Sequence, residues 1–388
     1  MEVIKELPKG FKANGYKDGY GFSIIISEKK AIASGVFTRN KVKAYPVIYS
    51  KDLLEKKKEF KAIIANSGNA ICLIKDGFET VNRIIEKASE LFNLNKEDIL
   101  IASTGVIGRK LDFGMLEERM IKVKELLENG NSIVNAAKGI MTTDKFPKYV
   151  AVKIGDVRVC GIAKGAGMIN PNMATMLCFI LTDIKIDKED LDKLLKDIVD
   201  KTFNNISVDG DTSTNDTVFI LANGESGVDY KNCKEDFYKA LLFVCRELAK
   251  MIVKDGEGAT KFLELTIKNA KSREDAKKAG KAIINSLLVK TALFGGDPNW
   301  GRIIAALGYS GAEFKDVDLI LSNGNEEIYL MRNGIGEDSG DILKKAENIM
   351  KGKEIKIIVD LKVGDVDETF YGCDLSYEYV KINAEYTT

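Results

Sequence analysis

The stretch AKGAGMINPNMATMLCFILTD, residues 163–183, joins a glycine-rich segment to a strongly apolar run. The apolar run predicts a buried strand, with Thr175 at its first position. The glycines beside Lys164 allow the backbone to turn tightly or to approach a ligand closely. A threonine at the start of a strand is most often only a β-branched strand residue, so its role depends on what the rest of the chain supplies.

Strand and helix patterns alternate along the whole chain. Apolar, β-branched runs predict strands at residues 21–27, 60–66, 149–155, 217–223, 262–268, 318–323 and 354–363. Apolar residues at helical spacing predict helices at 80–92 and 235–253, and further helices are expected at about 115–129, 187–203, 272–290 and 341–352. The fold class is therefore α/β or α+β.

The composition is that of a globular protein. Hydrophobic residues make up 45% and charged residues 30% of the 388 residues, enough for a large core in two domains or one elaborate domain. The 58 Lys and Arg balance 58 Asp and Glu, so no net charge attracts nucleic acid or an anionic membrane. The N-terminal sequence has no targeting pattern, and no apolar run approaches the roughly 20 residues of a membrane span. We therefore expect a cytoplasmic protein with no nucleic-acid or membrane partner.

The chain has no histidine, and its six cysteines include no C-x-x-C pair. A Ser-His-Asp triad, a Cys-His dyad and every histidine-ligated metal site are thereby excluded. We expect buried reduced thiols, no metal and no cofactor. If the protein is an enzyme, its base must be a carboxylate, a lysine or an amine.

Three other motifs invite a functional interpretation. SVDGDTSTND, residues 207–216, has Thr214 and Ile220 where an EF-hand loop needs Gly and Glu, so it predicts a polar turn instead. KGAGMI, residues 164–169, fits neither G-x-G-x-x-G nor the Walker pattern. In ASTGVIG, residues 102–108, Thr104 and Gly105 could offer a hydroxyl and a backbone N–H to an anion, although an ordinary strand-to-loop turn is commoner.

Thr175 gains a function if the bond between Ala174 and Thr175 is cut. It would then carry a hydroxyl and a free α-amine on one residue, and an α-amine has an ordinary pKa of about 7.7 to 8. Such an amine is a general base near neutral pH, held covalently beside its nucleophile. It would take the place of the missing histidine.

Together the motifs resemble the ornithine acetyltransferase (glutamate N-acetyltransferase) family of arginine biosynthesis. KGAGMINPNMATMLCFILTD is similar to the family's self-processing segment, and other stretches follow in the family's order: ANSGNA, ASTGVIG, GIMTTDKFPK, SVDGDTSTNDT, DGEGATK, LVKTALFGGDPNWGR and INAEYTT. The resemblance implies an αββα-type layered core with a smaller C-terminal α/β region. It also implies self-cleavage at Ala174-Thr175 into an α chain (1–174) and a β chain (175–388), which assemble as an α2β2 heterotetramer.

The resemblance further implies an activity. Thr175 would take the acetyl group from N2-acetyl-L-ornithine and pass it to L-glutamate, by ping-pong catalysis through an acetyl-threonine ester. Thr104 and Gly105 would form the oxyanion hole. The implied substrate-binding positions are Thr142 (with Thr143 as the close alternative), Lys164, Thr175, Glu257, Asn383 and Thr388. An α-carboxylate suits Lys164, and Glu257 could receive an amino group. Asn383 and Thr388 require an ordered C-terminal tail at the site.

Other functions stay open. An N-terminal-threonine amidohydrolase or aminopeptidase of similar architecture would use water as the acceptor, and an uncleaved small-molecule binding protein would catalyse no reaction. Some members of the family also accept acetyl-CoA as a donor for glutamate, and no motif of this chain distinguishes the two kinds.

Overall fold

The structure, a computed structural model, describes residues 1–170, 176–337 and 339–385. The chain forms two compact units: Met1–Asn204 with Asp211–Ile252, and Asn205–Gly210 with Val253–Thr387. The boundary between these units does not follow the bond between Ala174 and Thr175, because the chain after that bond contributes to both units. The division into an α chain and a β chain concerns cleavage, and it stays a prediction.

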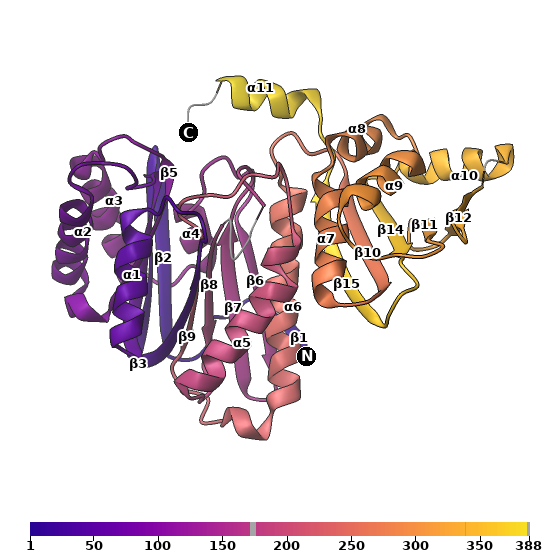
Figure 1. The fold of residues 1–388 in the computed structure, drawn as a ribbon. Helices are drawn as coiled ribbons and strands as arrows, with labels where there is room; N and C mark the ends of the chain where they lie inside the picture. Colours follow the sequence, from indigo (N-terminus) through magenta and orange to yellow (C-terminus); the bar gives the residue numbers. More distant parts are fainter. Residues whose placement is uncertain (171–175, 338, 386–388) are drawn as a thin grey trace. The chain divides into compact units, whose positions relative to one another are not determined.

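The first unit is built on one nine-stranded sheet, in the order β1-β6-β7-β8-β9-β3-β4-β5 with β2 joined to β3 (Figure 1). The long strand β3 belongs to both halves of this sheet, because its first part pairs with β2 and β4 and its last part pairs with β9. A register shift between Ile26 and Ala31 separates the two parts. The bounds are β1 Glu2–Ile4, β2 Phe11–Asp18, β3 Tyr20–Phe37, β4 Glu59–Asn69, β5 Ile99–Val106, β6 Lys148–Ile154, β7 Val157–Lys164, β8 Leu177–Thr182 and β9 Thr217–Ala222.

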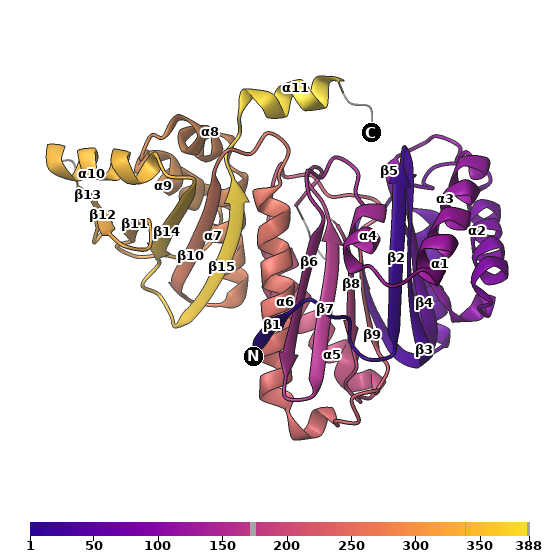
Figure 2. The ribbon, with the colours of Figure 1, turned by 180° about the vertical axis from the view of Figure 1, so that it is seen from behind.

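Two strand layers and two helix layers make up this unit (Figures 1 and 2). Ile25 from one half of the sheet shares an apolar core with Phe179 from the other half. Helices α2 and α3 cover the outside of the first half. Helix α6 packs so closely on β7 that a Cβ at Gly161 would lie 2.8 Å from Leu248 Cδ1. The bounds are α1 Tyr45–Lys56, α2 Gly77–Phe92, α3 Phe113–Glu128, α4 Ile133–Gly139, α5 Lys188–Lys201 and α6 Lys234–Lys254. The expected αββα core is confirmed.

The second unit has a six-stranded sheet in the order β13-β12-β11-β14-β10-β15. Ile283 of α7 and Leu307 of α9 pack into its apolar core. The bounds are β10 Phe262–Ala270, α7 Arg273–Asn285, α8 Leu287–Gly295, α9 Trp300–Tyr309, β11 Asp318–Ser322, β12 Glu327–Arg332, β13 Ile335–Gly336, α10 Gly340–Met350, β14 Glu354–Asp360, β15 Val366–Cys373 and α11 Tyr377–Glu385. This unit is the smaller C-terminal α/β region.

Most predicted elements form within a few residues of their expected bounds, and one predicted helix is wrong as a single element. The helix expected at 272–290 ends at Asn285, and Ser286 caps a new helix by accepting a hydrogen bond from Val289 N. This cap favours two separate helices, because it gives a hydrogen-bond partner to Val289 N–H, which has none within the first turn of the second helix.

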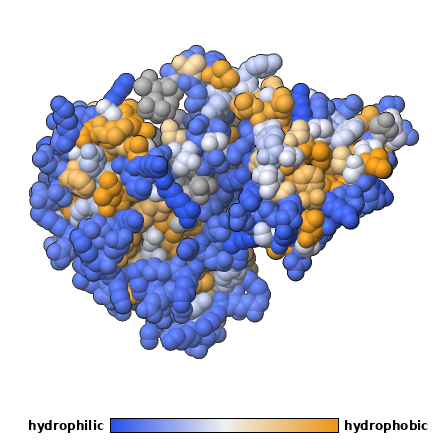
Figure 3. Space-filling view, in the orientation of Figure 1, coloured by the Kyte–Doolittle hydropathy of each residue, from blue (hydrophilic) through white to orange (hydrophobic). Residues whose placement is uncertain are grey.

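The six cysteines are all free thiols, five of them buried and Cys233 partly buried, as expected. Burial raises the pKa of Cys160 to about 12, which makes that thiol a poor nucleophile at neutral pH. Among the described residues, no helix is long and apolar enough to cross a membrane. Figure 3 shows a largely hydrophilic face with several hydrophobic patches.

Candidate active site

Lys164 and Thr104 meet near the ends of two strands of the first unit. Lys164 is the last residue of β7 and only 7% exposed. Its Nζ donates to Thr104 Oγ1, in β5, at 3.2 Å. Two predicted site residues from distant parts of the chain therefore converge. An ammonium group and a hydroxyl in a mostly buried position are suited to binding an anion.

A buried carboxylate, Asp144, organises the surroundings of Lys164. Its Oδ1 accepts from Gly165 N and from Lys148 Nζ, each at 2.7 Å, and its Oδ2 accepts from Thr142 N at 2.9 Å. Burial raises the pKa of Asp144, but the positive charges of Lys164 and Lys148 outweigh this effect and hold the pKa at about 2. Asp144 is therefore ionised at neutral pH and fixes the backbone directly after Lys164.

A third lysine reaches the same cluster from β2. Lys17 Nζ donates to the carbonyl oxygens of Met141, at 2.6 Å, and Thr142, at 3.4 Å. Burial lowers the pKa of Lys17, while Asp144 raises it and Lys164 lowers it by smaller amounts. Thr142 thus joins the cluster through its backbone, and its contact with substrate stays a prediction, with Thr143 as the alternative.

Gly105 stands where a side chain does not fit. Its φ is +131°, and a Cβ would lie 2.3 Å from the Gly68 carbonyl carbon and 2.4 Å from Asn69 N. Because β4 runs on to Asn69, β5 keeps a partner and continues through Val106. Thr104 and Gly105 therefore lie among the last residues of β5, and the motif leaves the strand after Val106.

The strand that follows Thr175 in sequence lies beside Lys164. Strand β8 pairs antiparallel with β7, which puts Leu177 opposite Lys164. On its other side β8 pairs with β9, and Thr217 N donates to Met176 O at 2.9 Å. Ala174 and Thr175 lie outside the described residues. Met176 and Leu177 are the residues that follow them, and both are buried.

Asp216, directly before β9, was not expected in the site. It is 2% exposed, and its Oδ2 has no hydrogen-bond partner among the described residues. Burial raises the pKa of Asp216 well above its ordinary value, against the effects of Ser213, Lys164 and Thr38. A buried carboxyl group that holds its proton can donate a hydrogen bond at neutral pH.

In the second unit the structure brings Glu257 and Asn383 together. Asn383 Nδ2, on α11, donates to Glu257 Oε2 at 2.9 Å. The same loop is fixed one residue later, where Ser376 Oγ donates to Gly258 O at 2.5 Å. The C-terminal segment is thus held against the Glu257 loop, and Thr388 lies outside the described residues.

The structure therefore groups Thr104, Lys164 and the Thr142 backbone in the first unit, and Glu257 with Asn383 in the second. Sequence reasoning missed Lys17, Asp144 and Lys148. A signal for the last two was present, because Asp144 and Lys148 lie four residues apart within the motif GIMTTDKFPK, residues 139–148. Their ion pair is fully buried, which the sequence alone does not reveal.

The layered α/β core brings buried lysine, threonine and carboxylate groups together, an arrangement that is typical of enzyme active sites. Residues 6–388 match the model of the ArgJ family. The chain is 63% identical over 392 residues to a glutamate N-acetyltransferase of Methanocaldococcus jannaschii, covering 98% of each chain. It is 47% identical over 409 residues to an arginine biosynthesis bifunctional protein ArgJ of Caldanaerobacter subterraneus subsp. tengcongensis, covering 100% of each. The chain belongs to the ArgJ family.

Solved structures also match parts of the chain. Arginine biosynthesis bifunctional protein ArgJ of Bacillus halodurans is 40% identical, with a TM-score of 0.49, and the match covers 53% of this chain and 96% of that one. An ornithine acetyltransferase of Mycobacterium tuberculosis in complex with ornithine is 32% identical, with a TM-score of 0.39, over 43% of this chain and 94% of that one.

Proposed function

We propose that this protein transfers the acetyl group of N2-acetyl-L-ornithine to L-glutamate, after cutting its own chain between Ala174 and Thr175. The coarser assignment, an acyltransferase of arginine biosynthesis, follows from the family and from the names of relatives up to 63% identical. The observation that carries the finer proposal is the 3.2 Å contact between buried Lys164 and Thr104. Lys164 ends strand β7, which pairs with β8, the strand that follows Thr175 in sequence.

The first proposed step is self-cleavage. Thr175 Oγ attacks the carbonyl carbon of Ala174, its proton passes to the departing amide nitrogen, and an ester replaces the peptide bond. Water then hydrolyses the ester, which leaves a carboxylate on Ala174. Thr175 retains its hydroxyl and gains a free α-amine.

The second proposed step is acetyl transfer. The α-amine takes the proton from Thr175 Oγ, which attacks the acetyl carbonyl carbon, and ornithine leaves with that proton on its own nitrogen. The amine of L-glutamate then attacks the acetyl ester, and the proton it loses returns to Thr175 Oγ. Thr104 and Gly105 would donate hydrogen bonds to the oxyanion of both tetrahedral intermediates.

We propose that protein groups of opposite charge bind the two charged ends of the substrate. Lys164 would attract the α-carboxylate, and Glu257, with Asn383 and Thr388, would receive the amino group of the side chain. The burial of both Lys164 and Glu257, 7% and 8% exposed, supports this division because desolvation strengthens each attraction. We further propose an α2β2 assembly in the cytoplasm, without a cofactor.

Mass spectrometry of the purified protein tests self-cleavage. We expect two fragments divided at Ala174-Thr175, one uncut and inactive chain for Thr175→Ala, and cleavage with reduced transfer for Thr175→Ser, which keeps a hydroxyl and would keep the amine. Appreciable transfer by Thr175→Ala would remove Thr175 from its proposed role.

Two assays separate the neighbouring functions. Consumption of acetylornithine that depends on glutamate supports transfer, whereas release of acetate at the same rate without glutamate identifies the hydrolase. Incubation of the enzyme with acetyl-CoA and glutamate shows whether it also accepts acetyl-CoA as an acetyl donor. A protein that forms no acetyl adduct on Thr175 would be the uncleaved binding protein instead.

A further inference from the structure

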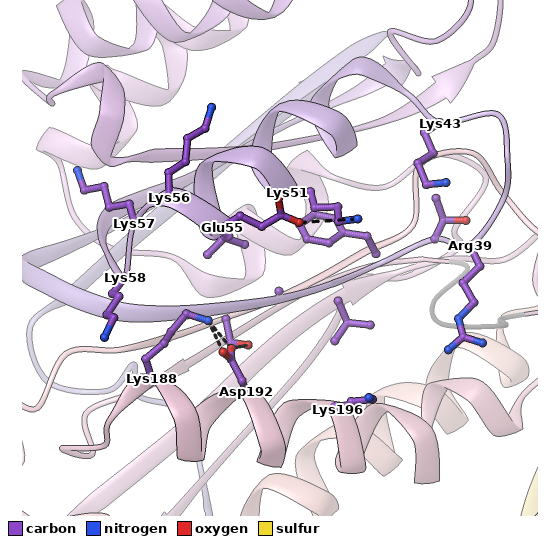
Figure 4. Close-up of a pocket in the computed structure, with 16 residues that line it drawn as sticks. Arg39, Lys43, Lys51, Glu55, Lys56, Lys57, Lys58, Lys188, Asp192 and Lys196 are labelled. Carbon is purple, nitrogen blue, oxygen red and sulfur yellow. Dashed lines mark hydrogen bonds and ion pairs between the residues drawn. The ribbon is translucent and has the colours of Figure 1, made fainter.

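A long groove in the first unit lies between helices α1 and α5 and runs over the last part of β3 (Figure 4). Its floor includes Val36 and Phe37, and its volume is about 870 Å³. Sites for small molecules usually occupy about 300 to 1,000 Å³. None of the residues proposed for acetyl transfer is among the described residues that line this groove.

The lining of the groove is strongly basic. Eight of its residues are lysine or arginine and two, Glu55 and Asp192, are acidic. The whole chain has as many acidic as basic residues, so this excess of positive charge is local. Like charges gathered in one concave surface repel one another, and the same geometry raises the local concentration of anions.

One end of the groove holds positive charges that the carboxylates of the described residues neutralise little or not at all. Arg39 and Lys43 extend from the segment after β3, and Lys196 lies across from them on α5 (Figure 4). In the described part of the chain, no carboxylate pairs with Arg39 or Lys196, and Lys43 Nζ donates to the Asn40 carbonyl oxygen at 2.7 Å. Lys51 is only weakly compensated, because its Nζ lies 3.9 Å from the Glu55 carboxylate. This end would therefore gain most from a bound anion.

The other end of the groove is partly neutralised. Lys188 forms an ion pair with Asp192, and Lys57 pairs with Asp98. Lys58 adds a positive charge that no carboxylate of the described chain pairs with. Unpaired cations therefore stand at both ends of the groove, with apolar side chains between them.

We propose that this groove binds a small ligand that carries two or more phosphate groups. Arginine forms bidentate hydrogen bonds with phosphate and lysine attracts it as a point charge, so Arg39, Lys43 and Lys196 would hold one end of the chain of phosphates. The basic side chains lie within one groove of about 870 Å³ on a chain without net charge, which favours a small polyphosphate over a nucleic acid, since a nucleic acid needs an extended basic surface.

Isothermal titration calorimetry of the full-length protein with sodium tripolyphosphate tests this proposal. We expect micromolar binding that weakens with salt, and at least a tenfold loss in the triple variant R39Q/K43Q/K196Q. The control K12Q/K122Q/K239Q removes the same number of charges from exposed lysines of other elements and should stay within twofold of the wild type. Melting curves confirm that both variants fold.

Three results would overturn the proposal: no heat of binding at millimolar tripolyphosphate, an equal loss in the control variant, or displacement of tripolyphosphate by an oligonucleotide at lower concentration. A parallel titration with ATP separates the sources of the phosphate chain. Tighter binding of ATP identifies a nucleotide that also uses the apolar floor, and tighter binding of tripolyphosphate identifies an inorganic polyphosphate.

Discussion

Lys164 is a buried, charged residue that contacts Thr104 in the candidate site. Replacing it by Met removes a charged hydrogen bond worth about 1.5 to 3 kcal/mol, so kcat/KM for acetylornithine should fall about 10- to 100-fold. The control Lys138→Gln changes an exposed lysine of α4 and should leave kcat/KM within twofold. Steady-state kinetics of the two variants make the comparison, and equal values would remove Lys164 from the site.

Asp144 predicts a pH dependence of stability. Its pKa of about 2 in the folded protein lies below the ordinary 3.8, so the ionised group stabilises the fold above about pH 4 and this contribution is lost as the pH falls towards 2. The difference corresponds to about 2 kcal/mol. Urea unfolding between pH 7 and pH 2 should show the free energy of unfolding of Asp144→Asn converging on that of the wild type below pH 4. The exposed control Asp156→Asn should follow the wild type throughout; a constant gap for Asp144→Asn would contradict the assignment.

At the level of the element, Gly105 allows the backbones of β4 and β5 to approach closely beside Thr104. Gly105→Ala would bring a Cβ within 2.4 Å of two backbone atoms, so we expect loss of acetyl transfer and a lower melting temperature. Gly108→Ala is the matched control, because Gly108 also has a positive φ, +75°, but no atom within 4 Å of its Cβ. Circular dichroism and activity are measured for both. Equal behaviour of the two variants would mean that backbone conformation, and not the close approach, is what matters.

Helix α11 carries a second prediction at this scale. Asn383→Ala removes the donor that faces Glu257 at 2.9 Å, and KM for acetylornithine should rise about tenfold. Lys381→Ala, an exposed change on the same helix, tests whether the effect belongs to the helix as a whole. If both variants raise KM equally, α11 acts through its docking and Asn383 has no specific role.

The elements differ in how well the sequence predicts them. The strand after Thr175 follows directly from a continuous apolar run, because all six residues of β8 are buried, and helix α6 follows from apolar residues at helical spacing. Helix α11 buries none of its residues, so it leaves no apolar pattern to detect. Thr104 and Lys164 could be proposed for the site from motifs, whereas the contact between them depends on strand order. The spacing of Asp144 and Lys148 is a local signal, but their burial beside Lys164 depends on long-range packing that the sequence does not reveal.

On the scale of the whole molecule, the proposed cut falls inside a shared sheet. Strands β1 to β7 precede Thr175, and β8 and β9, which follow it, lie between β7 and β3. Cleavage would therefore leave two chains held by strand pairing on both sides. Denaturing electrophoresis should show two fragments. Native mass spectrometry of the same sample should show both fragments together in one complex. Release of either fragment without denaturant would contradict this expectation.

The place of β3 in the sheet also affects how the protein is made. Its last part pairs with β9, and Phe37 meets Thr217 about 180 residues later in the chain. At a synthesis rate of about 5 to 20 residues per second, the ribosome needs roughly 10 to 35 seconds to supply that partner. During this interval one edge of β3 is open to pairing with another nascent chain. This edge closes only when Thr217–Ala222 has been made and β9 pairs with the last part of β3.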